Sequence, residues 1–173
     1  MTEENDSVAR RAWVVMGAAG CGKSTVAPRL CSALAGAFGE DVSRAVTFIE
    51  GDEHHPPGNV AKMSRGEPLT DEDRRPWLES LAARMREACS TSETANVVLA
   101  CSALKRKHRA TLTEVASTGD VPLSEVHFLH LDVSPRVLEE RLEARALRGE
   151  HFFAPSLLQS QLDDLEVDDD DHD

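Results

Sequence analysis

The chain has few aromatic residues and no apolar run long enough to cross a membrane. Only 4% of its 173 residues are aromatic and none is Tyr, which indicates a core of aliphatic side chains. No apolar run reaches the length of about 18 residues that a transmembrane helix needs. The first seven residues are polar and acidic, unlike a secretory signal. We therefore expect a cytoplasmic protein without a membrane partner.

The four cysteines, Cys21, Cys31, Cys89 and Cys101, are spaced irregularly and form no C-x-x-C pair. This spacing indicates neither a zinc site nor a redox pair. Reduced thiols are the expectation for such cysteines in the cytosol.

Basic residues are also scarce: 19 Lys and Arg stand against 31 Asp and Glu, and the net charge is −12. Eight of the acidic residues fall in 163–173, which holds no Lys or Arg. Such a run is usually solvated, so we expect an acidic tail at 167–173 and a flexible N-terminus at 1–11. The chain offers no basic face for nucleic acid. The remainder, 12–166, has the length of one domain.

The most informative segment is glycine-rich and lies between an apolar run and a helical pattern. It reads G-x-x-x-x-G-K-S, and the residues expected to bind nucleotide are Gly17, Ala18, Ala19, Gly20, Cys21, Gly22, Lys23, Ser24 and Thr25. Its glycines let successive N–H groups point at phosphate oxygens, and the N-terminus of the next helix adds partial positive charge. In such a loop Lys23 reaches the β- and γ-phosphates and the Ser24 hydroxyl binds Mg²⁺. The segment therefore predicts a site for ATP and Mg²⁺.

Short apolar runs alternate with helical patterns along the rest of the chain. Candidate strands are residues 12–16, 46–50, 97–101 and 126–131, all mostly apolar, as buried parallel strands are. Helical patterns cover 25–37, 76–90 and 105–116, Ser134 caps a further helix, and Pro155 opens the last. The alternation predicts an α/β fold with a parallel sheet. Ligands of such sheets bind at the carboxyl ends of the strands.

Two residues in the loops after these strands suit phosphoryl transfer to a small acid. An acceptor hydroxyl needs an oxygen nearby to take its proton, and Asp52 follows the second strand on the side of the glycine-rich segment. The residues alone leave a Mg²⁺ ligand or a helix cap open for Asp52. Arg74 can supply a fork of donors to an anionic substrate, or can pair with Asp71 or Asp73.

Arg141 and Arg145 lie four residues apart and so share one helix face. In a small kinase this region would be a mobile lid, here around 141–153, that brings arginines over the transferring phosphoryl group. The alternative is a solvated helix on which these arginines pair with neighbouring glutamates.

Taken together, these segments resemble the small P-loop gluconokinases, which are related to shikimate and nucleoside monophosphate kinases. The pattern G-D-x-x-H-P-x-x-N-x-x-K-M begins at Gly51, and G-x-P-L-x-D-x-D-R-x-P-W-L begins at Gly66. The block A-C-S-A-L-K fills 100–105, and L-x-x-Q-x-x-x-L-E begins at Leu158. The resemblance runs from about residue 12 to residue 166.

The resemblance implies ATP- and Mg²⁺-dependent phosphorylation of D-gluconate at its 6-hydroxyl, which gives 6-phospho-D-gluconate for the pentose phosphate pathway. It also implies the three-layer P-loop NTPase fold of nucleoside monophosphate kinases and a homodimer. The implied catalytic residues are Lys23, Asp52, Arg74 and Arg145, and Arg141 joins the nucleotide site. The implied gluconate ligands are Asp52, His55, Lys62, Arg74, Ser102 and Lys105, and the implied metal ligand is Ser24, with Asp52 as a second candidate.

The chain departs from the family pattern in three places. The position that is usually Tyr after the block A-C-S-A-L-K is His108. The segment 145–151 is longer than the usual R-x-G-H, which leaves open which lid arginine meets the phosphates. The family continues beyond the segment that ends at Glu166, so we expect this fold to lack the last strand and helix.

Two other functions remain as alternatives: a kinase of the same fold for another hydroxylated acid, such as shikimate, and a nucleotide-binding protein without turnover.

Overall fold

The computed structural model describes residues 9–37, 46–90, 96–148 and 157–167, and within them a parallel four-stranded sheet. Its strands are β1 (Arg11–Met16), β2 (Val46–Glu50), β3 (Asn96–Ala100) and β4 (Glu125–His130), in the order β2-β3-β1-β4. Every neighbouring pair is parallel. The predicted α/β fold is confirmed, and each strand lies within one residue of its predicted bounds.

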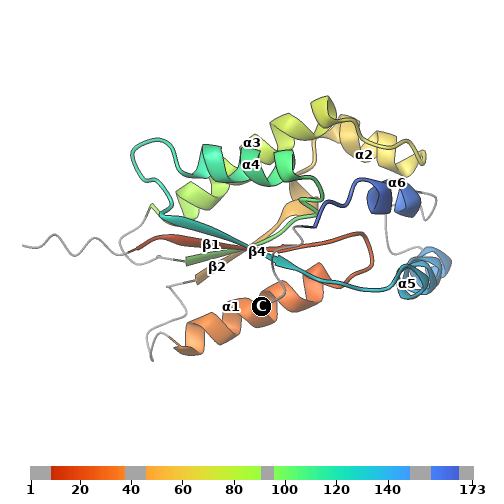
Figure 1. Cartoon of the computed structure of the whole chain (residues 1–173), viewed down its shortest axis with the longest axis horizontal. Coiled ribbons are helices and arrows are strands. Elements are labelled where there is room, and N and C mark those ends of the chain that lie inside the picture. Colours follow the sequence, from red (N-terminus) through yellow and green to blue (C-terminus); the bar gives the residue numbers. More distant parts are fainter. Residues whose placement is uncertain (1–8, 38–45, 91–95, 149–156, 168–173) are drawn as a thin grey trace, which may run out of the picture.

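Helices cover both faces of the sheet. They are α1 (Lys23–Ala37), the 3₁₀ helix η2 (Gly51–His54), α2 (Pro57–Ser64), α3 (Asp71–Ala88), α4 (Arg106–Ala116), α5 (Pro135–Arg148) and α6 (Leu158–Asp163). Figure 1 shows α1 on one face, α3 and α4 on the other, and α2, α5 and α6 beyond one end of the strands. None of the helices in the described ranges is long and apolar enough to span a membrane.

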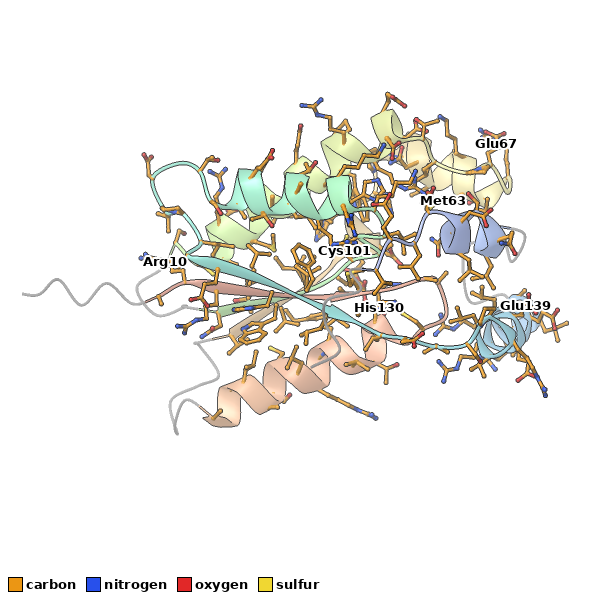
Figure 2. All side chains as sticks on the ribbon, viewed as in Figure 1. Arg10, Met63, Glu67, Cys101, His130 and Glu139 are labelled. Atoms are coloured by element: carbon orange, nitrogen blue, oxygen red, sulfur yellow. The ribbon has the colours of Figure 1, made fainter. Side chains whose placement is uncertain are left out.

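Apolar side chains fill both interfaces of the sheet, as the sticks of Figure 2 show. Leu81 and Met85 of α3 pack with Leu99 on one face, and Ala27 of α1 packs with Val98 on the other. These side chains are removed from water almost completely. Burial of this kind is the main favourable contribution to folding, so the sheet is a rigid base for the loops at its ends.

Two local predictions need correction. We expected α3 to begin near Pro76, but it begins at Asp71, because Thr70 and Asp73 form a capping box that satisfies the first backbone N–H groups. We also expected the segment after β2 to be a loop, but most of it forms η2 and α2. Pro57 favours this outcome because its fixed φ suits the first position of a helix.

Some predictions fall on residues outside the described ranges. These are most of the N-terminal segment 1–11, part of the lid (149–156) and most of the tail (168–173). Within the described ranges, the sheet has no strand beyond β4.

The carboxyl ends of three strands are joined by backbone hydrogen bonds. Cys101 N–H donates to Val15, Leu131 N–H donates to Met16, and Gly17 N–H donates to the carbonyl of Ser102. The segments that follow β1, β3 and β4 therefore start from one rigid edge of the sheet.

Candidate active site

The glycine-rich segment forms a tight turn between β1 and α1. Gly20 and Gly22 have φ of 84° and 108°, values that side chains with a Cβ rarely adopt. The Lys23 ammonium lies 3.0 Å from the carbonyl oxygen of Gly17 and 3.2 Å from that of Ala18. The side chain of Lys23 thus folds over the glycine-rich turn, and α1 begins at this turn, so the positive end of the helix dipole lies there.

Glu50, at the end of β2, lies beside the predicted magnesium ligand. Its carboxylate is hydrogen-bonded by the Ser24 hydroxyl, and its Oε1 is buried without a partner among the described residues. Burial raises the pKa of Glu50 above its ordinary value, with a smaller contribution of the same sign from Asp52. Sequence reasoning missed Glu50 because it reads as the last residue of a strand. The signal available was its place at a carboxyl end of the sheet.

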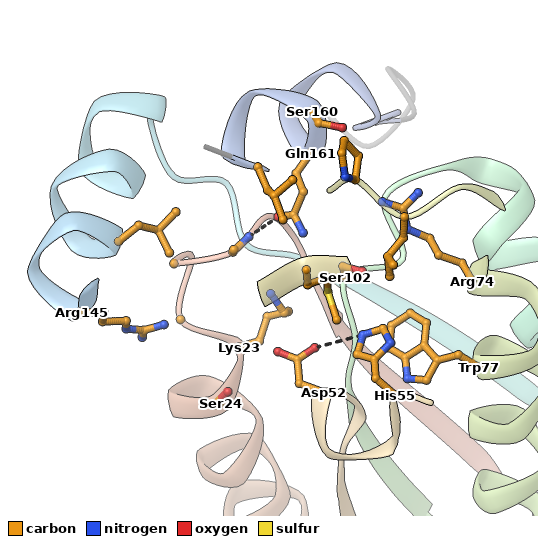
Figure 3. A pocket seen from close by; sticks show the side chains of 18 residues that line it. Lys23, Ser24, Asp52, His55, Arg74, Trp77, Ser102, Arg145, Ser160 and Gln161 are labelled. Atoms are coloured by element: carbon orange, nitrogen blue, oxygen red, sulfur yellow. Dashed lines mark hydrogen bonds and ion pairs between the residues drawn. The ribbon is translucent and has the colours of Figure 1, made fainter. Parts of the chain in front are cut away.

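Asp52 follows Gly51 in η2. A Cβ on residue 51 would lie 2.4 Å from the carbonyl oxygen of Ala100, so only glycine lets η2 pass this close to β3. The carboxylate of Asp52 thereby reaches the cavity beside the phosphate loop, where Figure 3 shows it near Lys23.

His55 stands between Asp52 and the core. Its ring stacks on Trp77 with centroids 3.9 Å apart, and its Nε2 lies 3.9 Å from Asp52 Oδ1. Trp77 is held in turn by a hydrogen bond from its Nε1 to the carbonyl of Gly51. Burial lowers the pKa of His55 to about 4, so the ring is neutral near pH 7. Asp52 therefore has an uncharged imidazole beside it.

Arg74 lines the opposite wall of the cavity and is 7% exposed. Its Nη1 donates to Asp164 Oδ2 at 3.2 Å, and Lys105 Nζ lies 2.7 Å from Oδ1 of the same carboxylate. Sequence reasoning offered Asp71 or Asp73 as the partner of Arg74, but Asp164 is the one that the structure shows. The remaining donors of Arg74 make a bidentate contact with a carboxylate possible.

A network of charged residues lies behind Arg74. Asp71 accepts from Lys107 and contacts His108, and these hydrogen bonds hold the pKa of Asp71 well below its usual range. Burial lowers the pKa of His108. With His108 neutral, Arg74, Lys105 and Lys107 face two carboxylates, those of Asp71 and Asp164. Glu72 also interacts with Asp71 and Lys107, so three basic and three acidic side chains balance in this network.

The segment after β3 presents Ser102 to the cavity. Ala103 has a φ of 42°, in the left-handed region that non-glycine residues seldom occupy. Arg109 Nη1 donates to the carbonyls of Ala103 and Leu104 and so holds this turn from α4. Such local strain often marks a functional segment.

The two arginines of α5 differ in their surroundings. Arg141 Nη1 donates to the carbonyl of Gly20 at 3.0 Å, whereas Arg145 lines the cavity. Figure 3 shows Arg145 reaching from α5 toward Lys23 and Ser24. Of the two, Arg145 is therefore the one placed to meet a phosphate.

The cavity brings together ten of the predicted residues: Ala19, Gly20, Gly22, Lys23, Ser24, Asp52, His55, Arg74, Ser102 and Arg145. Seven others do not line it, namely Gly17, Ala18, Cys21, Thr25, Lys62, Lys105 and Arg141. Among these, Lys62 is paired with Asp73 at 2.7 Å and Lys105 with Asp164. Within the described part of the chain, no cluster of three or more His, Cys, Asp or Glu side chains could hold a metal by itself.

A phosphate loop at the edge of a parallel sheet, facing a carboxylate and a buried arginine, defines a P-loop kinase. A family model described as an AAA domain matches residues 13–166. The gluconokinase of Gluconobacter oxydans is 45% identical over 158 residues, which cover 91% of this chain and 76% of that protein. A probable gluconokinase of Saccharomyces cerevisiae is 37% identical over 98% of this chain and 81% of its own length. The chain belongs to the gluconokinase family.

Solved structures agree with this assignment. An unliganded sugar kinase from Janibacter matches with a TM-score of 0.74 at 39% identity, covering 94% of this chain and 81% of that one. A gluconokinase from Sinorhizobium meliloti matches with a TM-score of 0.68 at 40% identity, covering 93% and 78%.

Proposed function

We propose that this protein transfers the γ-phosphoryl group of ATP to the 6-hydroxyl of D-gluconate, giving 6-phospho-D-gluconate and ADP. The observation that carries the proposal is the arrangement of one cavity. Lys23 and Ser24 line its phosphate side, Arg74 lines the other side, and Asp52 lies between them. Relatives named gluconokinase share the chain over most of its length.

The arrangement supports an in-line transfer. Arg74 binds the carboxylate of the sugar acid, so that the chain of hydroxyls extends toward the phosphate loop and the terminal hydroxyl meets Asp52. Asp52 accepts the hydroxyl proton as the oxygen attacks the γ-phosphorus. The new P–O bond forms while the bond to the β,γ-bridging oxygen breaks, and its electrons leave with ADP. Lys23 and Arg145 stabilise charge on the phosphoryl oxygens.

Residues that fit Mg²⁺ are present beside the phosphate loop. Ser24 supplies a hydroxyl, and the buried, unpartnered oxygen of Glu50 supplies a hard anionic ligand, either directly or through water. A Mg²⁺ ion held there would neutralise negative charge on the nucleotide phosphates. In this proposal Ser24 and Glu50 hold the metal, and Asp52 is left to serve the acceptor.

The test is a coupled assay of ADP release with the purified chain, ATP and a panel of acceptors. The panel contains D-gluconate, D-glucuronate, shikimate and D-glucose, which separate the carboxylate from the primary hydroxyl as requirements. We expect turnover with D-gluconate to exceed that with every other acceptor by tenfold or more, in line with about 1.4 kcal/mol of selective contact. Turnover with shikimate alone, or with no acceptor, would contradict the proposal.

A further inference from the structure

Gln161, on α6, has two opposed hydrogen-bonding ends at the mouth of the phosphate loop. Its Oε1 accepts from the backbone N–H of Ala19 at 2.6 Å. This bond fixes which end of the carboxamide is oxygen, because an N–H needs an acceptor. The NH₂ group must then point away from the Ala19 N–H, and Figure 3 shows it in the cavity on the side of Lys23.

The helix that carries Gln161 is anchored on both sides. Leu158 packs with Ala18, Cys21 and Leu142, beside the phosphate loop. Leu157 packs with Met63 of α2, which Figure 2 shows on the side of α2 that faces α6. Further along, Glu166 accepts the N–H of Arg106 at 2.6 Å. The helix that carries the carboxamide is therefore held in place by contacts on both sides.

We propose that Gln161 is a catalytic residue whose NH₂ group donates a hydrogen bond to the phosphoryl group during its transfer. The inference rests on the proposed function, because it places the donor between the phosphate loop and the acceptor. The oxygen end of Gln161 is bound to the loop, and its side chain lines the same cavity as Lys23 and Asp52, so its nitrogen end is available to a group in that cavity. Among the described residues no other hydrogen bond of Gln161 is present to occupy this donor.

A donor in this position acts mainly on turnover. The phosphoryl oxygens carry the charge of the transition state, and a preorganised donor aimed at them stabilises that state more than the bound ground state. Removing one donor of this type typically lowers kcat by about 10²- to 10³-fold.

The test compares Gln161→Glu with Gln161→Met. Glu keeps an oxygen for the Ala19 N–H but places a negative acceptor where the NH₂ group was, whereas Met loses both bonds without adding charge. We expect Gln161→Glu to lower kcat by about 10²-fold or more and to be less active than Gln161→Met. The matched control is Gln159→Glu, which makes the same change on the exposed side of the helix, where the Gln159 amide donates to Asp163 at 2.8 Å. This control should stay within about threefold of the wild type.

Binding measurements keep the result independent of folding and of the acceptor. We expect a non-hydrolysable ATP analogue to bind Gln161→Glu within about threefold of the wild type, and Mg·ADP with aluminium fluoride, a mimic of the phosphoryl group in transfer, to bind at least tenfold more weakly. A more active Glu than Met variant would show that Gln161 only latches the loop, and would overturn the proposal. Tighter binding of the ATP analogue to both variants would show that Gln161 merely occupies a phosphate position, which overturns it as well.

Failure of the proposed function is distinguishable. A wild-type chain without gluconate turnover contradicts the function, and the aluminium fluoride comparison then still decides the role of Gln161, since it needs no acceptor.

Discussion

Replacing Arg74 by alanine is the most informative single perturbation of the acceptor site. The side chain is 9% exposed, and one of its donors is committed to Asp164 at 3.2 Å. Arg74 also lines the cavity. Losing a charge-assisted bidentate contact with a carboxylate costs about 2–3 kcal/mol, and this corresponds to a rise of roughly 30- to 150-fold in the KM for gluconate. The KM for ATP should change by less than about threefold.

The neighbouring residue supplies a matched control. Arg75 lies on the same helix, but its side chain is 76% exposed and pairs with Glu79 one turn away. A surface pair of this kind contributes little, so Arg75→Ala should leave both KM values unchanged. Steady-state kinetics with each substrate varied in turn, together with a thermal melt to confirm folding, measures the difference. An Arg74→Ala variant that is folded and has an unchanged gluconate KM would show that Arg74 does not bind the gluconate carboxylate.

Four further changes test the other residues. Lys23→Ala should lower turnover by about 10²-fold or more with little change in melting temperature, because the ammonium neutralises phosphate charge; near-normal turnover would contradict this. Asp52→Asn should lower kcat strongly yet keep the affinity for an ATP analogue, because the amide accepts no proton; an equal loss of nucleotide affinity would point to a metal ligand. Glu50→Gln should raise the Mg²⁺ concentration for half-maximal activity by about tenfold, and an unchanged Mg²⁺ dependence would speak against the site. In the folded protein the pKa of His55 is about 4, below its ordinary value of about 6.5. The free energy of unfolding of the wild type should therefore fall by about 3 kcal/mol between pH 6.5 and pH 4, as measured by urea melts. His55→Asn should reduce this pH dependence, and an unchanged dependence would contradict the burial of a neutral His55.

Local patterns were enough to predict the sheet and the phosphate loop. The strands 46–50 and 97–101 are short apolar runs, and their burial on both faces explains why the pattern was readable. The glycine spacing up to Lys23 reports a backbone conformation that few other residues can adopt. These signals lie within a few neighbouring residues, so one sequence contains them.

The features that the sequence did not predict depend on contacts between residues that are far apart in the chain. The partner of Arg74 is Asp164, 90 residues away, and no local spacing predicts that pair. Glu50 gives only the signal of a strand end, because its role follows from the position of Ser24 on another element. The early start of α3 was missed because Pro76 suggested a first helical residue, whereas the capping box at Thr70 already opens the helix.

The position of the new phosphate ester decides whether this cavity phosphorylates the primary hydroxyl of gluconate. The measurement is the ¹H-coupled ³¹P NMR spectrum after wild-type protein is incubated with ATP, Mg²⁺ and D-gluconate, with Asp52→Asn as the control. A phosphate ester on the terminal carbon couples to two equivalent or near-equivalent protons, so we predict a triplet-like monoester signal that is absent with Asp52→Asn. A doublet from an ester on an internal carbon, or inorganic phosphate as the sole product, would contradict transfer to the 6-hydroxyl.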